Sequence, residues 1–220
     1  EQNVSRIDLL IATHPHADHI GGMEKVIRNF EIGKIYLPKV ADRQTPTTKT
    51  YEGMLQAISN KGLKMTQAKA GMTVYEQDGV RLEFLAPNGE SYSDLNNYSV
   101  VSKLTVGETS FVFTGDAETE SEKEILDAGF DVSCDVLKLG HHGSSTSTSD
   151  RFLEAANPRY AIISCGVDND YGHPHKEIVN KLQAFSIPFY RTDTQGTILA
   201  ETDGQTVKLS ANHPSVVEKA

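Results

Sequence analysis

The sequence contains two cysteines, Cys134 and Cys165, and no tryptophan. Two thiols are too few for a disulfide framework or for a thiolate zinc site, so we expect both to be buried apolar residues. The glycine-rich spacings GxGxxG and GxxxxGK[ST] are also absent, which excludes the common nucleotide-binding loops. The chemistry of this chain must therefore be sought in other residue types.

Long hydrophobic runs are missing as well. No window approaches the ~18 consecutive apolar residues of a membrane-spanning helix, and the opening residues EQNVSRID lack the profile of a signal peptide. We therefore expect no membrane contact within this segment. The first residue is Glu1 rather than methionine, as in a processed or excised part of a larger chain.

Positive charge is scarce, and the formal net charge is −9. Such a chain repels polyanions on average, which argues against extended, non-specific binding of nucleic acid. A phosphate-containing substrate would need a locally positive site, such as a metal centre. With 220 residues and 38% hydrophobic content, the chain can bury one sizeable core. We predict a single domain over residues 1–220.

Hydrophobic periodicity predicts strands and helices that alternate along most of the chain, with antiparallel hairpins between them. We expect strands at 7–13, 34–38, 135–139 and 160–164, helices at 18–30, around 51–58, at 149–156 and at 175–185, and hairpins over 72–87, over 98–116 and around Asp203-Gly204. Interleaved strands and helices with antiparallel hairpins indicate a layered α/β architecture, with mixed sheets and helices packed outside.

The chain has eight histidines, and seven of them lie in three tight groups. Each group follows a predicted strand, where a loop can carry a site on a rigid scaffold. Neutral imidazole is a common ligand for zinc and similar metals, and carboxylates complete such sites. The three groups are His14, His16 and His19, then His141 and His142, then His173 and His175. This grouping favours metal ligation.

The first group has an informative spacing, THPHADHIGG over residues 13–22. In an extended segment the side chains of His14 and His16 point the same way and can bind one ion together. If a helix starts near Ala17, Asp18 and His19 lie in its first turn and can face a second ion. A solvated loop with an aspartate cap would explain one histidine, but it does not explain this whole pattern.

The segment THPHADHIGG matches the H-x-H-x-D-H signature of the metallo-β-lactamase superfamily. The segment FVFTGDAE is similar to a later motif of that superfamily, in which a strand ends at a metal-bridging aspartate, here Asp116. The segment VLKLGHHGSS resembles its final motif, which delivers a ligand histidine, here His141 or His142. With YGHPHKE and YRTDTQGTI, the chain resembles the hydrolase domain of ComEC competence proteins and their secreted relatives.

The resemblance implies a metallo-β-lactamase-like αββα sandwich, built of two mixed sheets with outer helices. It also implies two divalent metal ions, Zn²⁺ or Mn²⁺. One ion would be held by His14, His16 and Asp116, and the other by Asp18, His19, Asp116 and either His141 or His142. Alternation at a strand end would aim one of these adjacent histidines at metal and the other at substrate. An extracytoplasmic location rests on the resemblance alone.

Two features depart from the superfamily pattern. Several strands normally precede the H-x-H-x-D-H segment, which here begins at His14. Without them we expect an uncovered sheet face and an open edge, which is an aggregation hazard. The usual third histidine between His19 and Asp116 is also absent, and Asn97 and Ser99 are the nearest candidates to replace it.

The predicted mechanism is hydrolysis by a water activated between two metal ions. Asp18 would orient or deprotonate this water. His173 would contact the substrate or give a proton to the leaving group, or else only stabilise its loop. The resemblance implies a phosphodiester substrate, and the negative composition favours single-stranded DNA or a small phosphodiester. The alternatives are an acyl hydrolase acting on a lactone, β-lactam or other ester, and a metal-stabilised binding module without catalysis.

Overall fold

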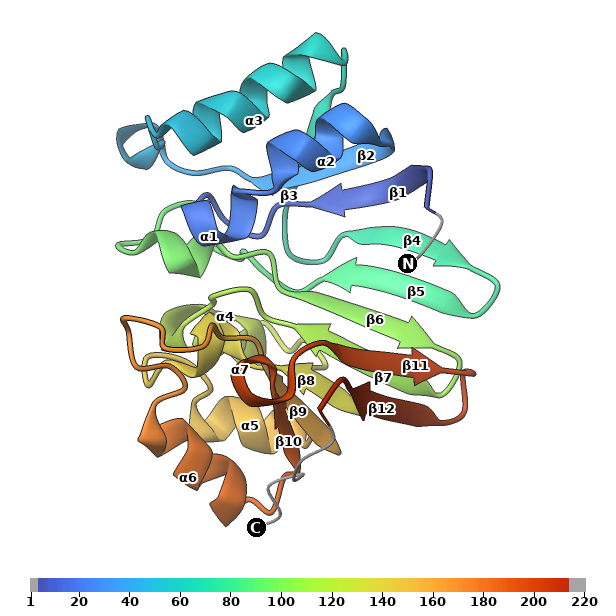
Figure 1. The fold of residues 1–220 in the computed structure, drawn as a ribbon, viewed down its shortest axis with the longest axis vertical. Coiled ribbons are helices and arrows are strands. Elements are labelled where there is room, and N and C mark those ends of the chain that lie inside the picture. Colours follow the sequence, from blue (N-terminus) through green and yellow to red (C-terminus); the bar gives the residue numbers. More distant parts are fainter. Residues whose placement is uncertain (1–3, 214–220) are drawn as a thin grey trace.

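The computed structural model describes residues 4–213 as stacked layers of helices and sheets (Figure 1). The strands are β1 (Arg6–Ile11), β2 (Glu31–Pro38), β3 (Met65–Ala68), β4 (Thr73–Gln77), β5 (Val80–Phe84), β6 (Ser102–Val106), β7 (Thr109–Phe113), β8 (Val136–Lys138), β9 (Tyr160–Ile163), β10 (Phe189–Arg191), β11 (Ile198–Thr202) and β12 (Val207–Ala211). The helices are α1 (Ala17–Ile20), α2 (Met23–Asn29), α3 (Lys49–Asn60), α4 (Thr119–Asp127), α5 (Asp150–Ala156), α6 (Lys176–Ala184) and α7 (Thr192–Gln195). Three 3₁₀ turns are η1 (Asp42–Gln44), η2 (Leu95–Tyr98) and η3 (Gly140–Gly143).

The amino-terminal layer is a parallel sheet in the order β1-β2-β3, covered on one face by α2 and α3. The apolar residues of α3 recur at helical spacing and pack with Ile27 and Ile35 into one buried cluster. Thr48 caps α3, because its hydroxyl accepts a hydrogen bond from the backbone N–H of Tyr51 at 3.3 Å. This small sheet therefore gives β1 a rigid support just before the first histidines.

The second sheet has seven strands in the order β10-β9-β8-β7-β6-β5-β4. Its antiparallel half consists of the two expected hairpins, β4-β5 and β6-β7, while β7 to β10 run parallel. Helices α4, α5 and α6 cover one face, where Ile125, Phe152 and Leu182 join the main hydrophobic core. The carboxyl ends of β7 and β8 therefore lie side by side, and each leads directly into a loop.

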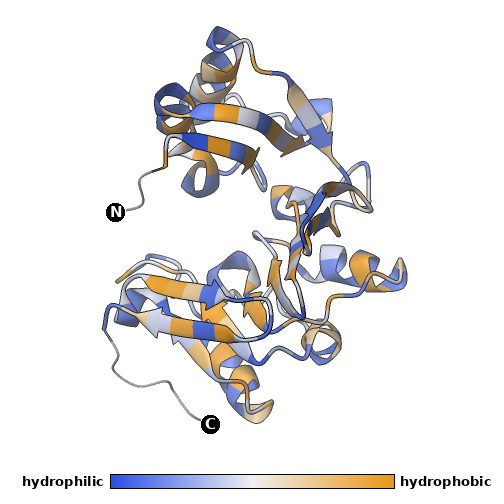
Figure 2. Ribbon diagram, turned by 90° about the vertical axis from the view of Figure 1, so that its right-hand side faces the viewer, coloured by the Kyte–Doolittle hydropathy of each residue, from blue (hydrophilic) through white to orange (hydrophobic). Residues whose placement is uncertain are grey.

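The other face of the seven-stranded sheet is covered by the parallel sheet and by the hairpin β11-β12. Alternation along β7 shows the two sides, because Val112 belongs to the helix-covered core and Phe111 packs with Val207 of the hairpin. The layers thus form the expected αββα sandwich (Figure 2). The fold class is confirmed, with one difference: among residues 4–213 the three-stranded sheet is wholly parallel.

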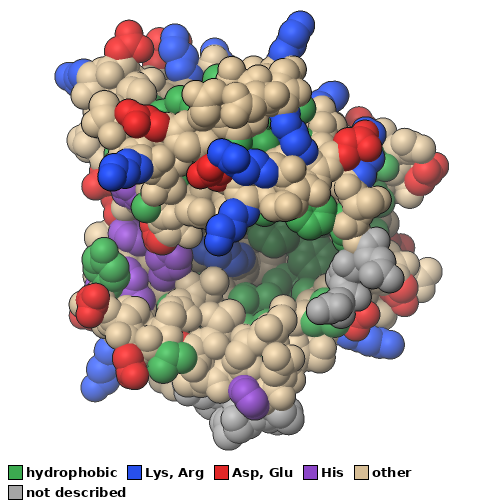
Figure 3. Space-filling model, turned by 45° about the horizontal axis from the view of Figure 1, so that its top comes forward, with side chains coloured by type: hydrophobic (Ala, Val, Ile, Leu, Met, Phe, Trp, Pro, Cys, Tyr) green, Lys and Arg blue, Asp and Glu red, His purple; other side chains and the backbone are tan. Residues whose placement is uncertain are grey.

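A hollow with hydrophobic side chains on its floor opens on one side of the molecule, beside a group of histidines (Figure 3). In the described part of the chain, β1 pairs with β2 alone, so its other edge carries no strand. Phe113, at the end of β7 and on the same side of the sheet as Phe111, is 41% exposed. These observations match the expected uncovered face and open edge.

The helical region after the first histidines differs from the prediction. The single helix expected over 18–30 is wrong, because the chain forms two helices, α1 and α2, that meet at Gly21 and Gly22. Glycine costs about 1 kcal/mol relative to alanine in a helix interior, so this pair favours a break. Within residues 4–213, no helix combines the length and apolar character that a membrane span requires.

Candidate metal centre

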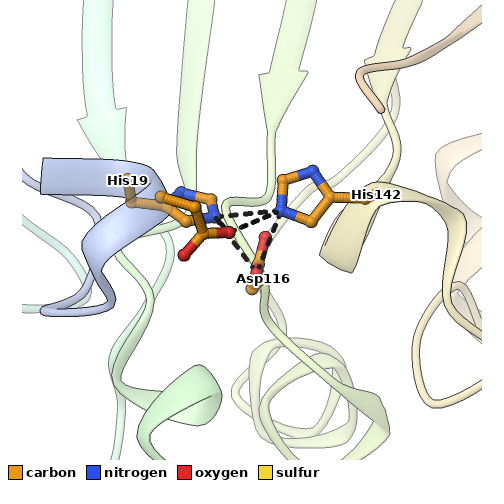
Figure 4. A group of neighbouring side chains, drawn as sticks. His19, Asp116 and His142 are labelled. Carbon is orange, nitrogen blue, oxygen red and sulfur yellow. Dashed lines mark hydrogen bonds and ion pairs between the residues drawn. The ribbon is translucent and has the colours of Figure 1, made fainter. Parts of the chain in front are cut away.

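Four of the predicted residues form one compact group at the end of the sandwich (Figure 4). They are Asp18 and His19 of α1, Asp116 after β7, and His142 after β8. One ligand atom from each residue lies within 4.8 Å of those of the others. The ends of β1, β7 and β8 converge here, so segments more than a hundred residues apart in sequence share one site.

The distances in this group are those of atoms arranged around a common point. The Nε2 atoms of His19 and His142 are 3.2 Å apart. The Oδ2 atom of Asp116 lies 3.1 and 3.4 Å from these nitrogens, and the Oδ2 atom of Asp18 lies 3.5 and 3.3 Å from them. Two ring nitrogens and two carboxylate oxygens therefore face one another, as they would around a cation.

A second set of atoms lies beside the first. His14 Nε2 is 3.0 Å from His16 Nδ1 and 3.8 Å from Asp116 Oδ2. Asp116 Oδ2 thus lies within 3.8 Å of the Nε2 atoms of His14, His19 and His142. The structure brings together six of the seven residues that the sequence predicted as metal ligands.

Hydrogen bonds outside this group orient the imidazole rings. The Nδ1 atom of His142 is 2.7 Å from the carbonyl oxygen of Ser164, so Nδ1 must carry the proton and donate. In the neutral ring, Nε2 then presents its lone pair to the group. The hydroxyl of Thr13 lies 3.2 Å from His14 Nδ1 and 3.3 Å from His19 Nδ1. Thr13 and Ser164 were not among the residues predicted from the sequence, although Thr13 adjoins the motif.

Ser99 also supports the site. Its hydroxyl accepts a hydrogen bond from the backbone N–H of Asp116 at 3.0 Å and lies 3.3 Å from His14 Nδ1. Gly115 makes this approach feasible, because it has φ +54° and a Cβ there would come within 3.0 Å of the Ser99 hydroxyl. Ser99 therefore positions two predicted ligands.

Asn97 has a different role. Its amide oxygen accepts hydrogen bonds from the backbone N–H groups of Glu118 and Ser121, and its amide nitrogen donates to Glu120. These contacts hold the first turn of α4, so both ends of the Asn97 amide are occupied away from the histidines. The neighbouring Asn96 lines the pocket instead, and its buried Oδ1 has no hydrogen-bond partner.

Burial and mutual contacts shift the ionisation of these groups. Burial lowers the pKa of His14 to about 3, so its ring is neutral and keeps a free lone pair near neutral pH. Burial opposes ionisation of Asp116, but hydrogen bonds from His142 and His19 outweigh it and lower the pKa of this carboxyl. The same contact with Asp116 raises the pKa of His142. The site thus offers both carboxylate oxygens and imidazole nitrogens as potential metal ligands.

These residues fit a dinuclear metal site of nitrogen and oxygen ligands. Asp116 is only 2% exposed, yet its Oδ1 has no hydrogen-bond partner. An unpartnered buried carboxylate oxygen is destabilising unless a cation or another donor satisfies it. Asp18, His19, Asp116 and His142 suit one ion, and His14 and His16 lie beside this group as the predicted ligands of a second ion. Histidine with carboxylate is a donor set that Zn²⁺ and Mn²⁺ accept.

His141 points elsewhere. Both His141 and His142 lie in the turn η3 with left-handed backbone angles, φ 45° and φ 56°, rather than in an extended strand end. The Nδ1 atom of His141 contacts the Thr146 hydroxyl at 3.1 Å and Glu118 at 3.2 Å. The ring of His141 therefore lies at the wall of the site, outside the four-residue group.

A pocket of about 640 Å³ opens beside these residues. Its walls include His16, Asp18, Asp116, His141, His142, Asn96, Cys165, Tyr171 and His173. The ring of His173 lies 5.4 Å from that of His141 and 6.2 Å from that of His142, measured between centroids. His175, by contrast, is the N-cap of α6. The pocket offers space for a substrate beside Asp18, Asp116 and His142 of the four-residue group and beside His16.

A family model described as the metallo-beta-lactamase superfamily matches residues 1–167. The chain belongs to this superfamily. The match covers the H-x-H-x-D-H segment, Asp116 and both adjacent histidines, which are the segments that meet in the site. Membership makes this chain a metallohydrolase-type domain whose His/Asp group has the composition of a metal centre.

Relatives and a solved structure agree with this assignment. ComE operon protein 3 of Bacillus subtilis (strain 168) is 34% identical over 90% of this chain, and Competence protein ComA of Neisseria gonorrhoeae is 33% identical over 89%. In both cases the match covers 25% of the relative, so the chain spans about a quarter of their length. CmlA, a diiron beta-hydroxylase from Streptomyces venezuelae, shares the fold with a TM-score of 0.52 at 16% identity, over 82% of this chain and 42% of CmlA.

Proposed function

We propose that the chain is a metal-dependent phosphodiesterase that acts on single-stranded DNA or on a small phosphodiester. The observation that carries this proposal is the pocket around the His/Asp group, where Asp18 and Asp116 face the substrate space. The resemblance to competence-protein hydrolase domains and the similarity to ComE operon protein 3 support the substrate class.

The pocket favours attack by water. The thiol that lines it belongs to Cys165, and burial raises the pKa of this thiol to about 11. The thiolate, which is the nucleophilic form, is therefore scarce near neutral pH. Two bound divalent cations would lower the pKa of a bound water and would offset the negative charge of a phosphate. Without these cations, the negative composition of the chain disfavours a phosphodiester.

The protein's own groups divide the remaining work. His14, His16, His19, His142 and Asp116 would hold the two ions. The Asp18 side chain is 62% exposed and lines the pocket, and its Oδ2 lies 3.5 Å from His19 Nε2, so it would be able to reach both a bound ion and a water in the pocket. We assign it to orient the attacking water and to accept its proton. Burial, together with the nearby histidines, lowers the pKa of His173 to about 4, so its neutral ring serves as a substrate contact.

Hydrolysis of bis-p-nitrophenyl phosphate tests the proposal. The metal-free protein should be inactive, and added Mn²⁺ or Zn²⁺ should restore turnover. His16→Ala should lower kcat/KM by about 100-fold or more, since even residues that only orient metal ligands are worth ~10–100-fold. His213→Ala, which removes a histidine outside the site, is the matched control and should keep the wild-type rate.

Two results would contradict the proposal. Preferential hydrolysis of nitrocefin or of a lactone would identify an acyl hydrolase, since the same ions polarise a carbonyl. Binding of about two ions without turnover of either substrate class would identify a binding module. Metal content is therefore measured on every sample.

A further inference from the structure

Tyr171 is a large aromatic side chain that is 78% exposed, yet it lines the pocket beside the metal centre. It lies in the loop between β9 and α6. Single exposed aromatic residues are normal on a protein surface and need no explanation. Tyr171 differs from Tyr75, which is 40% exposed on β4, because Tyr171 opens onto the substrate space.

The ring of Tyr171 continues a column of rings that begins at the metal centre. It stacks on His173 with a centroid distance of 5.6 Å and an angle of 18° between planes. His173 in turn stacks on His142 with a distance of 6.2 Å and an angle of 22°. These are offset-stacked geometries. One face of Tyr171 is therefore backed by His173, while most of the side chain remains open to solvent.

The loop holds Tyr171 in place without a ligand. The amide nitrogen of Asn169 donates to the carbonyls of Gly166 and His173, at 3.0 and 2.6 Å, and its amide oxygen accepts from the backbone N–H of His173 at 2.8 Å. His175 Nε2 lies 3.2 Å from the carbonyl oxygen of Tyr171 and can donate to it. A loop backbone that is already fixed, with the ring stacked on His173, reduces the conformational entropy that is lost when the ring binds a flat partner.

We propose that Tyr171 is a stacking platform for a nucleobase that flanks the scissile phosphodiester. This inference rests on the proposed function and assigns to that site a nucleotide substrate. Proteins bind single-stranded nucleic acid by stacking bases on aromatic side chains and holding the phosphates by positive charge, and two bound cations would supply that charge beside Tyr171. Stacking uses the face of the base, so the platform accepts any base sequence.

The absence of tryptophan allows a direct test, because Tyr171→Trp creates the sole tryptophan of the chain. The variant is loaded with Zn²⁺ and titrated with a short oligothymidylate at low salt. We expect the fluorescence of the introduced indole to fall by about half or more as the base stacks on it. An oligomer of the same length and charge with abasic units should leave this fluorescence unchanged. Tyr75→Trp is the matched control and should respond to neither oligomer.

The affinity of the same oligomers completes the test. Tyr171→Leu should raise the Kd for oligothymidylate by about 5- to 150-fold and leave the Kd for the abasic oligomer unchanged, while Tyr171→Phe should retain wild-type binding. Equal quenching by thymine-bearing and abasic oligomers would overturn the platform. So would an equal response to a neutral aromatic ester of the acyl-hydrolase class.

This readout is separate from catalysis. If the oligothymidylate quenches the indole of the Tyr171→Trp variant but no phosphodiester is cleaved, the platform stands and the proposed phosphodiesterase activity fails. If cleavage occurs and the indole does not respond to base, the activity stands and the platform is wrong. A dinucleoside monophosphate is titrated in parallel with the oligothymidylate. Equal affinities for the two ligands indicate a small phosphodiester substrate, and a higher affinity for the oligothymidylate indicates a longer single strand.

Discussion

Two adjacent histidines, His141 and His142, have distinct environments that adjacency in the sequence does not reveal. The turn η3 places His142 Nε2 in the four-residue group and places His141 against Glu118 and Thr146. Left-handed backbone angles at non-glycine residues are strained and persist only where surrounding contacts enforce them. Two such contacts are the hydrogen bonds from the backbone N–H of His141 to the carbonyl of Gly115, at 3.2 Å, and from the backbone N–H of His175 to the carbonyl of Gly143, at 2.9 Å.

Removal of each histidine in turn should therefore have unequal effects. His142→Asn should lower the zinc content from about two ions per chain toward one, because the second ion loses a nitrogen ligand. His141→Asn should retain both ions. Metal analysis after dialysis measures the stoichiometry, and circular dichroism shows that both variants are folded. A protein that loses an ion with His141→Asn but not with His142→Asn would reverse the assignment of the two rings.

At the scale of elements, α4 links the metal centre to the loop that runs from His142 to α5. Glu122 of α4 is buried, and its carboxylate accepts hydrogen bonds from the backbone N–H groups of Thr148 and of Ser149, the latter at 2.8 Å. This loop connects His142 with α5. Burial raises the pKa of Glu122, and the hydrogen bonds and Lys181 only partly oppose this effect.

The raised pKa sets the sign of a pH dependence. As the pH falls, the Glu122 carboxylate takes up a proton in the folded state at a higher pH than in the unfolded state, where its pKa is near 4.5. The free energy of unfolding therefore rises as the pH falls toward 4.5. The difference in unfolding free energy between wild type and Glu122→Gln should thus grow in favour of wild type from pH 8 to pH 5. Urea unfolding of EDTA-treated samples measures it.

The control for this experiment is Glu154→Gln, which removes one carboxylate from an exposed position of α5. A Glu122→Gln difference that does not change with pH, or that changes in the opposite direction, would mean that burial does not dominate at Glu122. Comparing two Glu→Gln variants removes the general effect of net charge on stability.

Local sequence predicted most elements, because their signals are local. All three antiparallel hairpins appeared as expected, around Asp78-Gly79, Gly107-Glu108 and Asp203-Gly204. The helix expected over 18–30 was wrong, because two weak helical segments with glycines between them look continuous by periodicity alone. The motif placed the candidate ligands, whereas the roles of Thr13 and Ser99 depend on contacts across layers that no local pattern encodes.

At the scale of the whole molecule, the site and the hollow lie on connected parts of the sandwich (Figure 3). The layer that faces β6 and β7 consists of two pieces, the sheet β1-β2-β3 and the hairpin β11-β12. The hairpin covers Phe111 but leaves Phe113 partly exposed. The candidate metal ligands lie just after the ends of β1, β7 and β8. They contact one another directly, for example His19 and His142 with Asp116.

The exposed apolar side chain of Phe113 and the unpaired edge of β1 should make the isolated 220-residue chain associate with itself as its concentration rises. Water-exposed hydrophobic patches and unpaired strand edges both favour association. Phe113→Thr removes the aromatic ring and introduces a residue that is also common in strands. At equal concentration, this variant should have an average mass in light scattering closer to that of the monomer than wild type has. Tyr75→Thr, at another exposed aromatic position in a strand, should leave the association unchanged. If wild type stays monomeric at high concentration, the expected association is absent. If Tyr75→Thr acts as strongly as Phe113→Thr, the surface around Phe113 is not the one that associates. Zinc content should be equal in all three proteins, because Phe113 belongs to neither group of metal ligands.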